Sequence, residues 1–299
     1  MGETMMIRFM GLFTALVILA SGATVSAFED KSPELTLVVM DPLAGPLACD
    51  CVKGYAQRKY EKLGEFLTKH LSRKVNVVWG ETLESAMEKS EGRVDIIVGK
   101  HSVVLSDAKD SKLSVTPLAR LTDLKDKVVQ TGLFVVRAND PAKTVEDLKG
   151  YRIFFGPEDC DEKSAAPMAF MKEKGIALPS TIETAPSCSN AAVMLMELPK
   201  DAKAAAIISS YAGPLLEGCG KVAKGDLRVI GESQPVPFIT LFVKSEMPAA
   251  DQKALSAALE EVGLDAQMLI DMETASGFVP WKEDAPAAPA ASVSSKKKD

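Results

Sequence analysis

Apolar residues follow two different spacings along the first hundred positions, and their order predicts a fold class. Short apolar runs at residues 35–40, 75–79 and 94–98 have the length of buried strands, whereas residues 52–71 and 82–90 repeat their apolar positions with helical spacing. Strands that alternate with helices build a parallel sheet through right-handed crossovers. We therefore expect an α/β unit in this part of the chain.

A second series of the same kind begins at Thr144, after two extended runs at residues 114–121 and 128–137 with no convincing helix between them. The motif TVED at residues 144–147 resembles a capping box, and Gly150 stands where a glycine commonly ends a helix. The strands expected next are residues 152–155, 181–184, 204–210 and 227–230, and the helices are residues 164–175 and 187–198. These elements predict a second α/β unit.

An extended run at residues 238–243 resembles the earlier run at residues 133–137. Helices are expected after it at residues 248–262 and 264–274. We expect the two extended runs to cross between two lobes and to act as the hinge of lobe closure.

The predicted division is lobe I at residues 28–132 and 237–281, and lobe II at residues 133–236. The expected fold class is α/β with two lobes, each a mainly parallel sheet flanked by helices, joined by two crossing strands. Open α/β sheets bind ligands at the carboxyl ends of their strands, so we expect the ligand in the cleft between the lobes.

The two ends of the chain are expected to lie outside the folded part. Arg8, an apolar run at residues 9–20 and small residues after it have the order of a secretory signal. We expect the signal peptide to span residues 1–27, with cleavage after Ala27 and export to the periplasm; an uncleaved N-terminal anchor is the alternative. Residues 282–299 are rich in Ala, Pro, Ser and Lys and are expected to form a disordered tail.

Composition and motifs narrow the class of function. The formal net charge of −6 argues against nucleic acid as a partner, because nucleic-acid binding needs a basic surface. The sequence contains no phosphate-binding loop of the GK[ST] type, no HExxH motif and no EF-hand loop. We therefore expect neither an enzyme nor a resident cofactor.

Three segments give the chain a resemblance to a known family. They are YEKLGEFL at residues 60–67, GRVDII at residues 92–97 and VEDLKGYRI at residues 145–153. In these segments and their order, the sequence resembles the periplasmic phosphonate- and phosphite-binding proteins of ABC importers. The resemblance implies the type II periplasmic-binding-protein fold, capture of a small phosphonate- or phosphate-like ligand, and an ABC permease in the membrane as partner. We expect the protein to be a monomer.

The family binds its anion with loops that precede helices, where unpaired N–H groups and the helix dipole favour an oxyanion. The resemblance implies that a Ser/Thr-rich loop after the first strand of lobe II supplies hydroxyl groups, and Ser164 matches that pattern. A histidine-bearing turn of the family is replaced here by SCSN at residues 187–190.

The loop EDCDE at residues 158–162 places four carboxylates where the anion would bind. A phosphonate with up to two negative charges would be repelled unless Lys53, Lys100 or Lys163 compensates the charge. The alternative is that these acids only stabilise a helix N-terminus from solvent. In both cases the loop argues against phosphonate as the ligand and leaves the expected fold unchanged.

Positions after strands and at helix starts give the expected ligand contacts. From lobe I these are Lys100, His101 and Ser102. From lobe II they are Ser164, Ser187, Ser189 and Asn190, with Tyr211 as a stacking group or hydroxyl donor. We expect these side chains to meet when the lobes close on the ligand.

Four of the five cysteines follow predicted strands that end at the cleft. They are Cys49, Cys51, Cys160 and Cys188, whereas Cys219 lies in a loop whose position the sequence does not determine. In an exported protein we expect at least one disulfide bond, and the odd number leaves one thiol unpaired. The alternative is a thiolate site for Cu(I), zinc or an iron–sulfur cluster. That site would make the chain a periplasmic metal-handling or redox accessory protein on the same fold.

Overall fold

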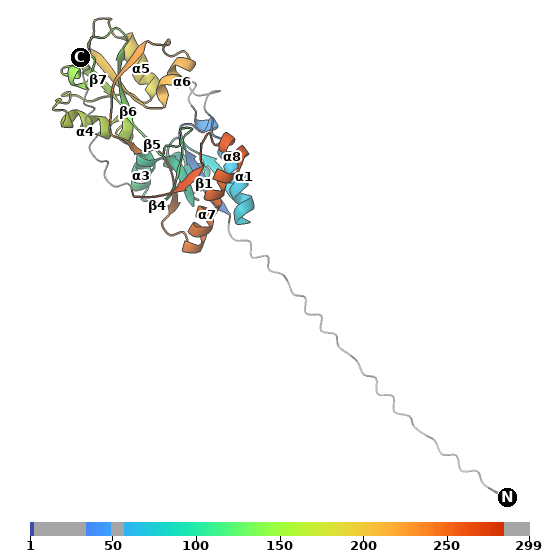
Figure 1. Ribbon diagram of the computed structural model, residues 1–299. Coiled ribbons are helices and arrows are strands. Elements are labelled where there is room, and N and C mark those ends of the chain that lie inside the picture. The colour runs from blue at the N-terminus through green and yellow to red at the C-terminus, as the bar shows by residue number, and fades with distance from the viewer. Residues whose placement is uncertain (3–33, 49–56, 284–299) are drawn as a thin grey trace. The chain divides into compact units, whose positions relative to one another are not determined.

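The computed structural model describes residues 1–2, 34–48 and 57–283 (Figure 1). The chain divides into residues 1–32 and residues 33–299, and every element below belongs to the second part. Almost all of the predicted signal peptide and of the predicted tail lies outside the described residues, as do Cys49, Cys51 and Lys53. The predictions for these parts stay predictions.

The first sheet has six strands in the order β13-β4-β12-β3-β1-β2. They are β1 (Leu35–Met40), β2 (Val75–Trp79), β3 (Ile96–Lys100), β4 (Val115–Leu121), β12 (Ile239–Lys244) and β13 (Phe278–Pro280). β1 pairs in parallel with β2 and β3, whereas β12 is antiparallel to β3 and β4. The sheet is therefore mixed rather than mainly parallel, because β12 enters it from an extended segment and not through a helical crossover.

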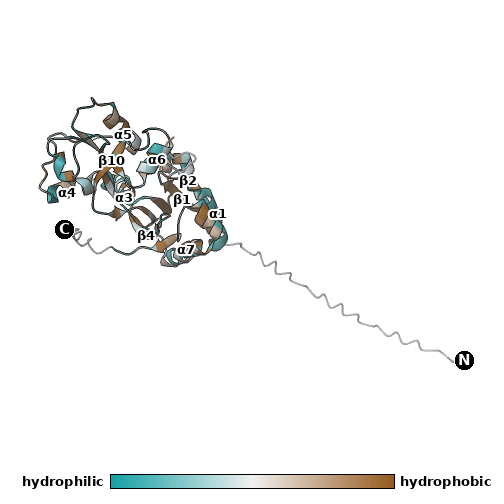
Figure 2. Cartoon of the chain, turned by 45° about the horizontal axis from the view of Figure 1, so that its top comes forward, coloured by the Kyte–Doolittle hydropathy of each residue, from teal (hydrophilic) through white to brown (hydrophobic). Residues whose placement is uncertain are grey.

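Helices cover both faces of this sheet, because successive side chains of its central strands point to opposite faces. Leu37 and Val39 of β1 pack in one core, and Val38 and Met40 pack in the other. The first core includes α1 (Tyr60–Leu71), α7 (Ala249–Glu261) and α8 (Ala266–Asp271), and the second includes α2 (Leu83–Lys89) and α3 (His101–Asp110). Figure 2 shows β1 in brown, whereas α1 carries both teal and brown residues, as expected of a helix buried on one side.

The second sheet has five strands in the order β10-β6-β9-β7-β8. They are β6 (Gly132–Arg137), β7 (Arg152–Phe155), β8 (Glu183–Thr184), β9 (Ala204–Ser209) and β10 (Leu227–Glu232). β7 is parallel to β8 and β9, whereas β6 is antiparallel to β9 and β10, so this sheet is also mixed. Its helices are α4 (Ala165–Glu173), α5 (Cys188–Glu197) and α6 (Ala212–Gly218), with the 3-10 turns η2 (Val145–Leu148) and η3 (Asp161–Lys163).

Two short strands carry the chain between the sheets. β5 (Val129–Gln130) leads from β4 into β6, β11 (Val236–Pro237) leads from β10 into β12, and the two pair with each other in antiparallel orientation. The runs expected to cross, residues 133–137 and 238–243, lie almost wholly inside β6 and β12 instead. Those runs are apolar because both strands are internal to their sheets. The lobe boundaries placed beside them stay a prediction.

Four helices differ from the sequence prediction. Within the described residues, the helix expected at residues 52–71 begins at Tyr60, and the helix expected at residues 264–274 is the turn η4 (Val262–Leu264) followed by the short α8. The apolar pattern did not predict α3, which starts directly after β3, or α6, which holds a proline and two glycines in seven residues. The longest helix in the described part of the chain has 13 residues, and no helix there has the length and apolar character of a membrane span.

Candidate functional site

A cavity of about 320 Å³ lies where segments from both sheets meet. Its lining residues follow the carboxyl ends of β1, β2 and β3 in the first sheet and of β7, β8 and β9 in the second. This is the edge at which open α/β sheets bind ligands. Its apolar side chains include Met40, Leu43, Leu47, Val103, Leu215 and Leu216. Its polar side chains include Lys100, Cys160, Ser187, Cys188, Ser189 and Tyr211.

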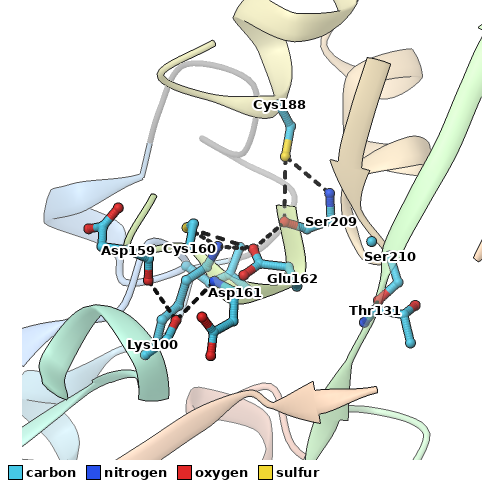
Figure 3. A network of polar contacts seen from close by, with 12 residues as sticks. Lys100, Thr131, Asp159, Cys160, Asp161, Glu162, Cys188, Ser209 and Ser210 are labelled. Atoms are coloured by element: carbon cyan, nitrogen blue, oxygen red, sulfur yellow. Dashed lines mark hydrogen bonds and ion pairs between the residues drawn. The ribbon is translucent and has the colours of Figure 1, made fainter. Parts of the chain in front are cut away.

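Lys100, the last residue of β3, forms an ion pair with Glu162 in η3, the turn after β7 (Figure 3). Nζ of Lys100 lies 2.5 Å from Oε1 of Glu162, and Oγ of Ser209 donates a hydrogen bond of 2.7 Å to the same oxygen. The Glu162 side chain is fully buried, and that of Lys100 is 7% exposed. The second carboxylate oxygen, Oε2, is buried and accepts no hydrogen bond from the described residues. The Lys100 ammonium group on the cavity lining is therefore already paired with the Glu162 carboxylate, which lies in a turn that follows a strand of the second sheet.

Burial and charge act in opposite directions on these two groups. Burial by itself would raise the pKa of Glu162, but Lys100 and Lys163 outweigh it, so that this pKa lies below its ordinary value of 4.5. Burial by itself would lower the pKa of Lys100, but Tyr211 and Glu162 outweigh it and hold this pKa well above 10.5. Both side chains are therefore charged at neutral pH.

Two thiols border the ion pair. Nζ of Lys100 donates to Sγ of Cys160 at 3.5 Å, and the backbone N–H of Ser209 donates to Sγ of Cys188 at 3.3 Å. Burial raises the pKa of the Cys160 thiol above its ordinary value of 9.0, which keeps it protonated at neutral pH. Among the described residues, Cys160, Cys188 and Cys219 form no disulfide bond, and no three His, Cys, Asp or Glu residues are arranged to hold a metal ion. The expected disulfide and the thiolate metal site therefore stay predictions.

Ser102, in the first turn of α3, joins the same two segments. Its Oγ donates a hydrogen bond of 2.7 Å to the backbone oxygen of Asp159 and accepts one of 3.1 Å from the backbone N–H of Asp161. Of the four carboxylates in this loop, Glu162 points inward to Lys100 and Glu158 is exposed. The loop therefore supplies an internal counterion, Glu162, as well as an acid that faces solvent, Glu158.

The cavity brings together half of the expected ligand contacts. Lys100, Ser187, Ser189 and Tyr211 line it, and so do the cysteines Cys160 and Cys188. In the described part of the chain, its lining does not include His101, Ser102, Ser164, Asn190 or Cys219. A ligand-binding role for each of these residues stays a prediction.

The expected contacts that lie away from the cavity are engaged elsewhere. The ring of His101 stacks on Trp281, with ring centroids 4.8 Å apart. Ser164 is buried at the N-cap of α4. The backbone N–H of Asn190 donates to Oγ of Ser187, the N-cap of α5. A place at a helix start therefore does not by itself direct a side chain into the cavity.

Sequence reasoning missed three parts of the site. Glu162 was recognised only as one of four acids in a loop, and its pairing with Lys100 has no local signal. Ser209 is the last residue of β9. A polar residue at the end of an apolar strand was a signal that could have identified it as a site residue. Leu215 and Leu216 belong to α6, which the apolar pattern did not predict.

Comparisons with known proteins agree with the described architecture. A sequence model of the family described as the periplasmic phosphonate substrate-binding protein of ABC transporters matches residues 54–285. No curated protein sequence matches the chain. The family's members bind a small-molecule substrate and work with an ABC transporter, as the sequence resemblance implied.

Solved structures share the fold at low sequence identity. XAC2383 from Xanthomonas citri bound to ATP has a TM-score of 0.63 and 18% identity, with 84% of this chain and 92% of that chain covered. A binding protein component of an ABC phosphonate transporter from Pseudomonas aeruginosa has a TM-score of 0.61 and 13% identity, with 83% and 82% covered. PhnD1 from Prochlorococcus marinus in complex with methylphosphonate has a TM-score of 0.60 and 13% identity, with 83% and 92% covered.

These likenesses concern the fold alone, because all the identities are below 25%. They confirm the two-lobed type II fold with its two crossing strands. The match to the family model concerns the sequence itself and extends over most of it. The chain therefore belongs to the family of periplasmic phosphonate substrate-binding proteins of ABC transporters.

Proposed function

We propose that this chain is the exported solute-binding component of an ABC importer, and that it captures a small solute in the 320 Å³ cavity. The observation that carries the proposal is that the cavity is lined by strand ends from both sheets, so that movement about β5 and β11 would open and close it. We also propose that the chain is exported with cleavage after Ala27 and that it is a monomer. It would neither catalyse a reaction nor hold a resident cofactor. The closed form would be the one that docks on the permease.

The size and lining of the cavity support a small solute. Small-molecule sites typically have volumes of roughly 300–1,000 Å³, so this cavity lies at the lower end of the range. Leu43 and Leu216 offer apolar contact, whereas Ser189 and Tyr211 offer hydroxyl groups. A solved relative holds methylphosphonate, which makes simple phosphonates the first class of solute to test.

Native mass spectrometry of protein purified from its own periplasm tests the proposal. Ser189→Trp would fill the cavity from the first turn of α5, whereas Glu197→Trp adds the same side chain at an exposed position near the end of that helix. We expect a small molecule to be released from the wild type and from Glu197→Trp, and not from Ser189→Trp. Absence of any bound solute from the wild type, or equal release from Ser189→Trp, would contradict solute capture in this cavity.

A second function is supported by one observation, that Cys160 and Cys188 line the same cavity. On this alternative the chain is a periplasmic metal-handling or redox accessory protein that binds a soft metal through thiolates. Thiol counting and metal analysis on anaerobically purified protein separate the two functions. Absence of bound metal with no more than three free thiols favours the importer component, because Cys160, Cys188 and Cys219 form no disulfide bond among the described residues. Four or five free thiols with bound metal favour the accessory protein.

A further inference from the structure

We propose that Glu162 is a tethered carboxylate that keeps Lys100 paired, so that the cavity selects a solute without net negative charge. This inference rests on the proposed function, because it names the class of solute that the same cavity takes. Its basis is the distance of 2.5 Å between Nζ of Lys100 and Oε1 of Glu162, which belong to segments of different sheets.

The charges around the cavity leave no excess of cations among the described residues. Lys100 and Lys163 line it together with Glu81 and Asp159, so that the formal charges of the lining cancel. Glu162, in contact with Lys100, adds one negative charge. At the described residues, an entering anion would therefore meet a surface that is neutral or negative, which does not favour its binding.

The carboxylate of Glu162 is also difficult for a free anion to displace. It is fully buried, and Oγ of Ser209 holds the oxygen that contacts Lys100. A group tethered to the same chain competes at an effective concentration in the millimolar range or above. Displacement would in addition leave Glu162 buried without its cation, and an unpaired buried charge is strongly unfavourable. A phosphonate at micromolar concentration would not replace it.

The remaining lining suits a net-neutral solute. The hydroxyl groups of Ser189 and Tyr211 can donate and accept hydrogen bonds without a requirement for charge. Leu43 and Leu215 supply apolar contact to the body of such a molecule. We therefore expect a small, partly apolar molecule with hydrogen-bonding groups.

Calorimetric titration with methylphosphonate and with inorganic phosphate tests the role of Glu162. Glu162→Gln removes the charge at nearly constant shape, and Glu158→Gln removes the same charge from an exposed position in the same loop. We expect wild type and Glu158→Gln to bind neither anion more tightly than millimolar. Glu162→Gln should gain at least tenfold in affinity, and the added substitution Lys100→Met should abolish that gain. Circular dichroism and thermal melting establish that each variant is folded, with Glu162→Ser as a replacement should Glu162→Gln not fold.

Three results would overturn the inference and leave the proposed function intact. The first is micromolar binding of methylphosphonate or phosphate by the wild type. The second is release of an anionic solute from protein purified from its own periplasm. The third is an unchanged anion affinity in folded Glu162→Gln and Glu162→Ser, which would show that Glu162 does not set the selectivity. Failure of the proposed function has a different signature, because then no solute of any charge is released from the wild type.

Discussion

Asp41 and Arg58 form a buried ion pair, with Oδ2 of Asp41 2.7 Å from Nη1 of Arg58 and side chains that are 0% and 3% exposed. The hydroxyl of Tyr60 donates a further hydrogen bond of 2.6 Å to Oδ2. Oδ1 of Asp41 accepts from the backbone N–H of Leu43, whose backbone oxygen accepts from the N–H of Arg58. The pair therefore fixes the segment after β1, which carries Leu43 and Leu47 to the cavity.

Breaking this ion pair should cost much of the protein's stability. Burial by itself would lower the pKa of Arg58, but Asp41 outweighs it and raises this pKa, so the guanidinium is charged and needs its partner. We expect Arg58→Met or Asp41→Leu alone to lower the free energy of unfolding by about 3–5 kcal/mol, because each leaves a buried charge unpaired. The double variant should recover a large part of the loss. Urea denaturation of all four proteins measures this, and additive losses in the double variant would contradict the ion-pair explanation.

Acid should remove the stability that Glu162 contributes. Burial by itself would raise the pKa of Glu162, but Lys100 outweighs it, so that this pKa is lower in the folded than in the unfolded protein. Such a carboxyl group stabilises the fold above its unfolded pKa and loses that contribution as the pH falls through the folded value. We expect the difference in free energy of unfolding between wild type and Glu162→Gln to be largest near neutral pH and to shrink below pH 4.5. Urea denaturation between pH 7 and pH 3 measures it, and a difference independent of pH would refute the assignment.

Arg137, the last residue of β6, closes the C-terminal end of α5. Its guanidinium donates to the backbone oxygens of Leu195, Leu198 and Pro199 at 2.6, 2.5 and 2.7 Å. Hydrogen bonds to charged groups contribute about 1.5–3 kcal/mol, and a cation at this end also interacts favourably with the helix dipole. We expect Arg137→Ala to lower the free energy of unfolding by about 2–3 kcal/mol.

Arg152 offers the control for this prediction. It pairs with Glu183 through two hydrogen bonds of 2.7 and 2.6 Å on the surface of the second sheet. Because exposed ion pairs are screened by solvent, Arg152→Ala should change the free energy of unfolding little. Equal losses for the two variants in urea denaturation would mean that the helix-closing bonds of Arg137 are not the cause.

Local signals in the sequence predicted most of the fold. The unbroken apolar run of residues 35–40 is buried along its whole length in β1. Thr144 forms the expected capping box, and Gly150 and Gly175 have the positive φ values of 78° and 69° that favour glycine at these ends. These features depend on neighbouring residues only. The antiparallel orientation of β12 in the first sheet depends on the path of the whole chain, so no local sequence pattern predicts it.

The candidate site was less predictable because it depends on contacts between distant residues. Lys100 comes just after the apolar run of residues 94–98, and that local signal was enough to predict that it lies at the ligand site, where it lines the cavity. Its partner Glu162 lies 62 positions later in the sequence, in a turn whose four acids look alike as sequence. Only the three-dimensional placement of η3 shows which acid turns inward. The same local rule named His101, but the helix that begins there directs its ring to Trp281, and the cavity lining in the described part of the chain does not include it.

Gly132 should be essential for the position of η3. It begins β6, and a Cβ atom there would overlap the backbone oxygen of Glu162 and lie 2.9 Å from Cγ of Pro167. Gly132→Ala must therefore displace the turn that carries Glu162, at a cost of about 1–3 kcal/mol in the free energy of unfolding, as overpacked sites show. Gly213→Ala in α6 is the matched control substitution, because its Cβ would meet nothing within 4 Å. It should be neutral or stabilising by up to about 1 kcal/mol.

Urea denaturation measures the stability of both variants. The rate at which a thiol reagent modifies the buried Cys160, in the turn before η3, reports the local displacement. We expect faster modification in Gly132→Ala and an unchanged rate in Gly213→Ala; wild-type stability together with a wild-type rate in Gly132→Ala would show that η3 does not depend on this glycine.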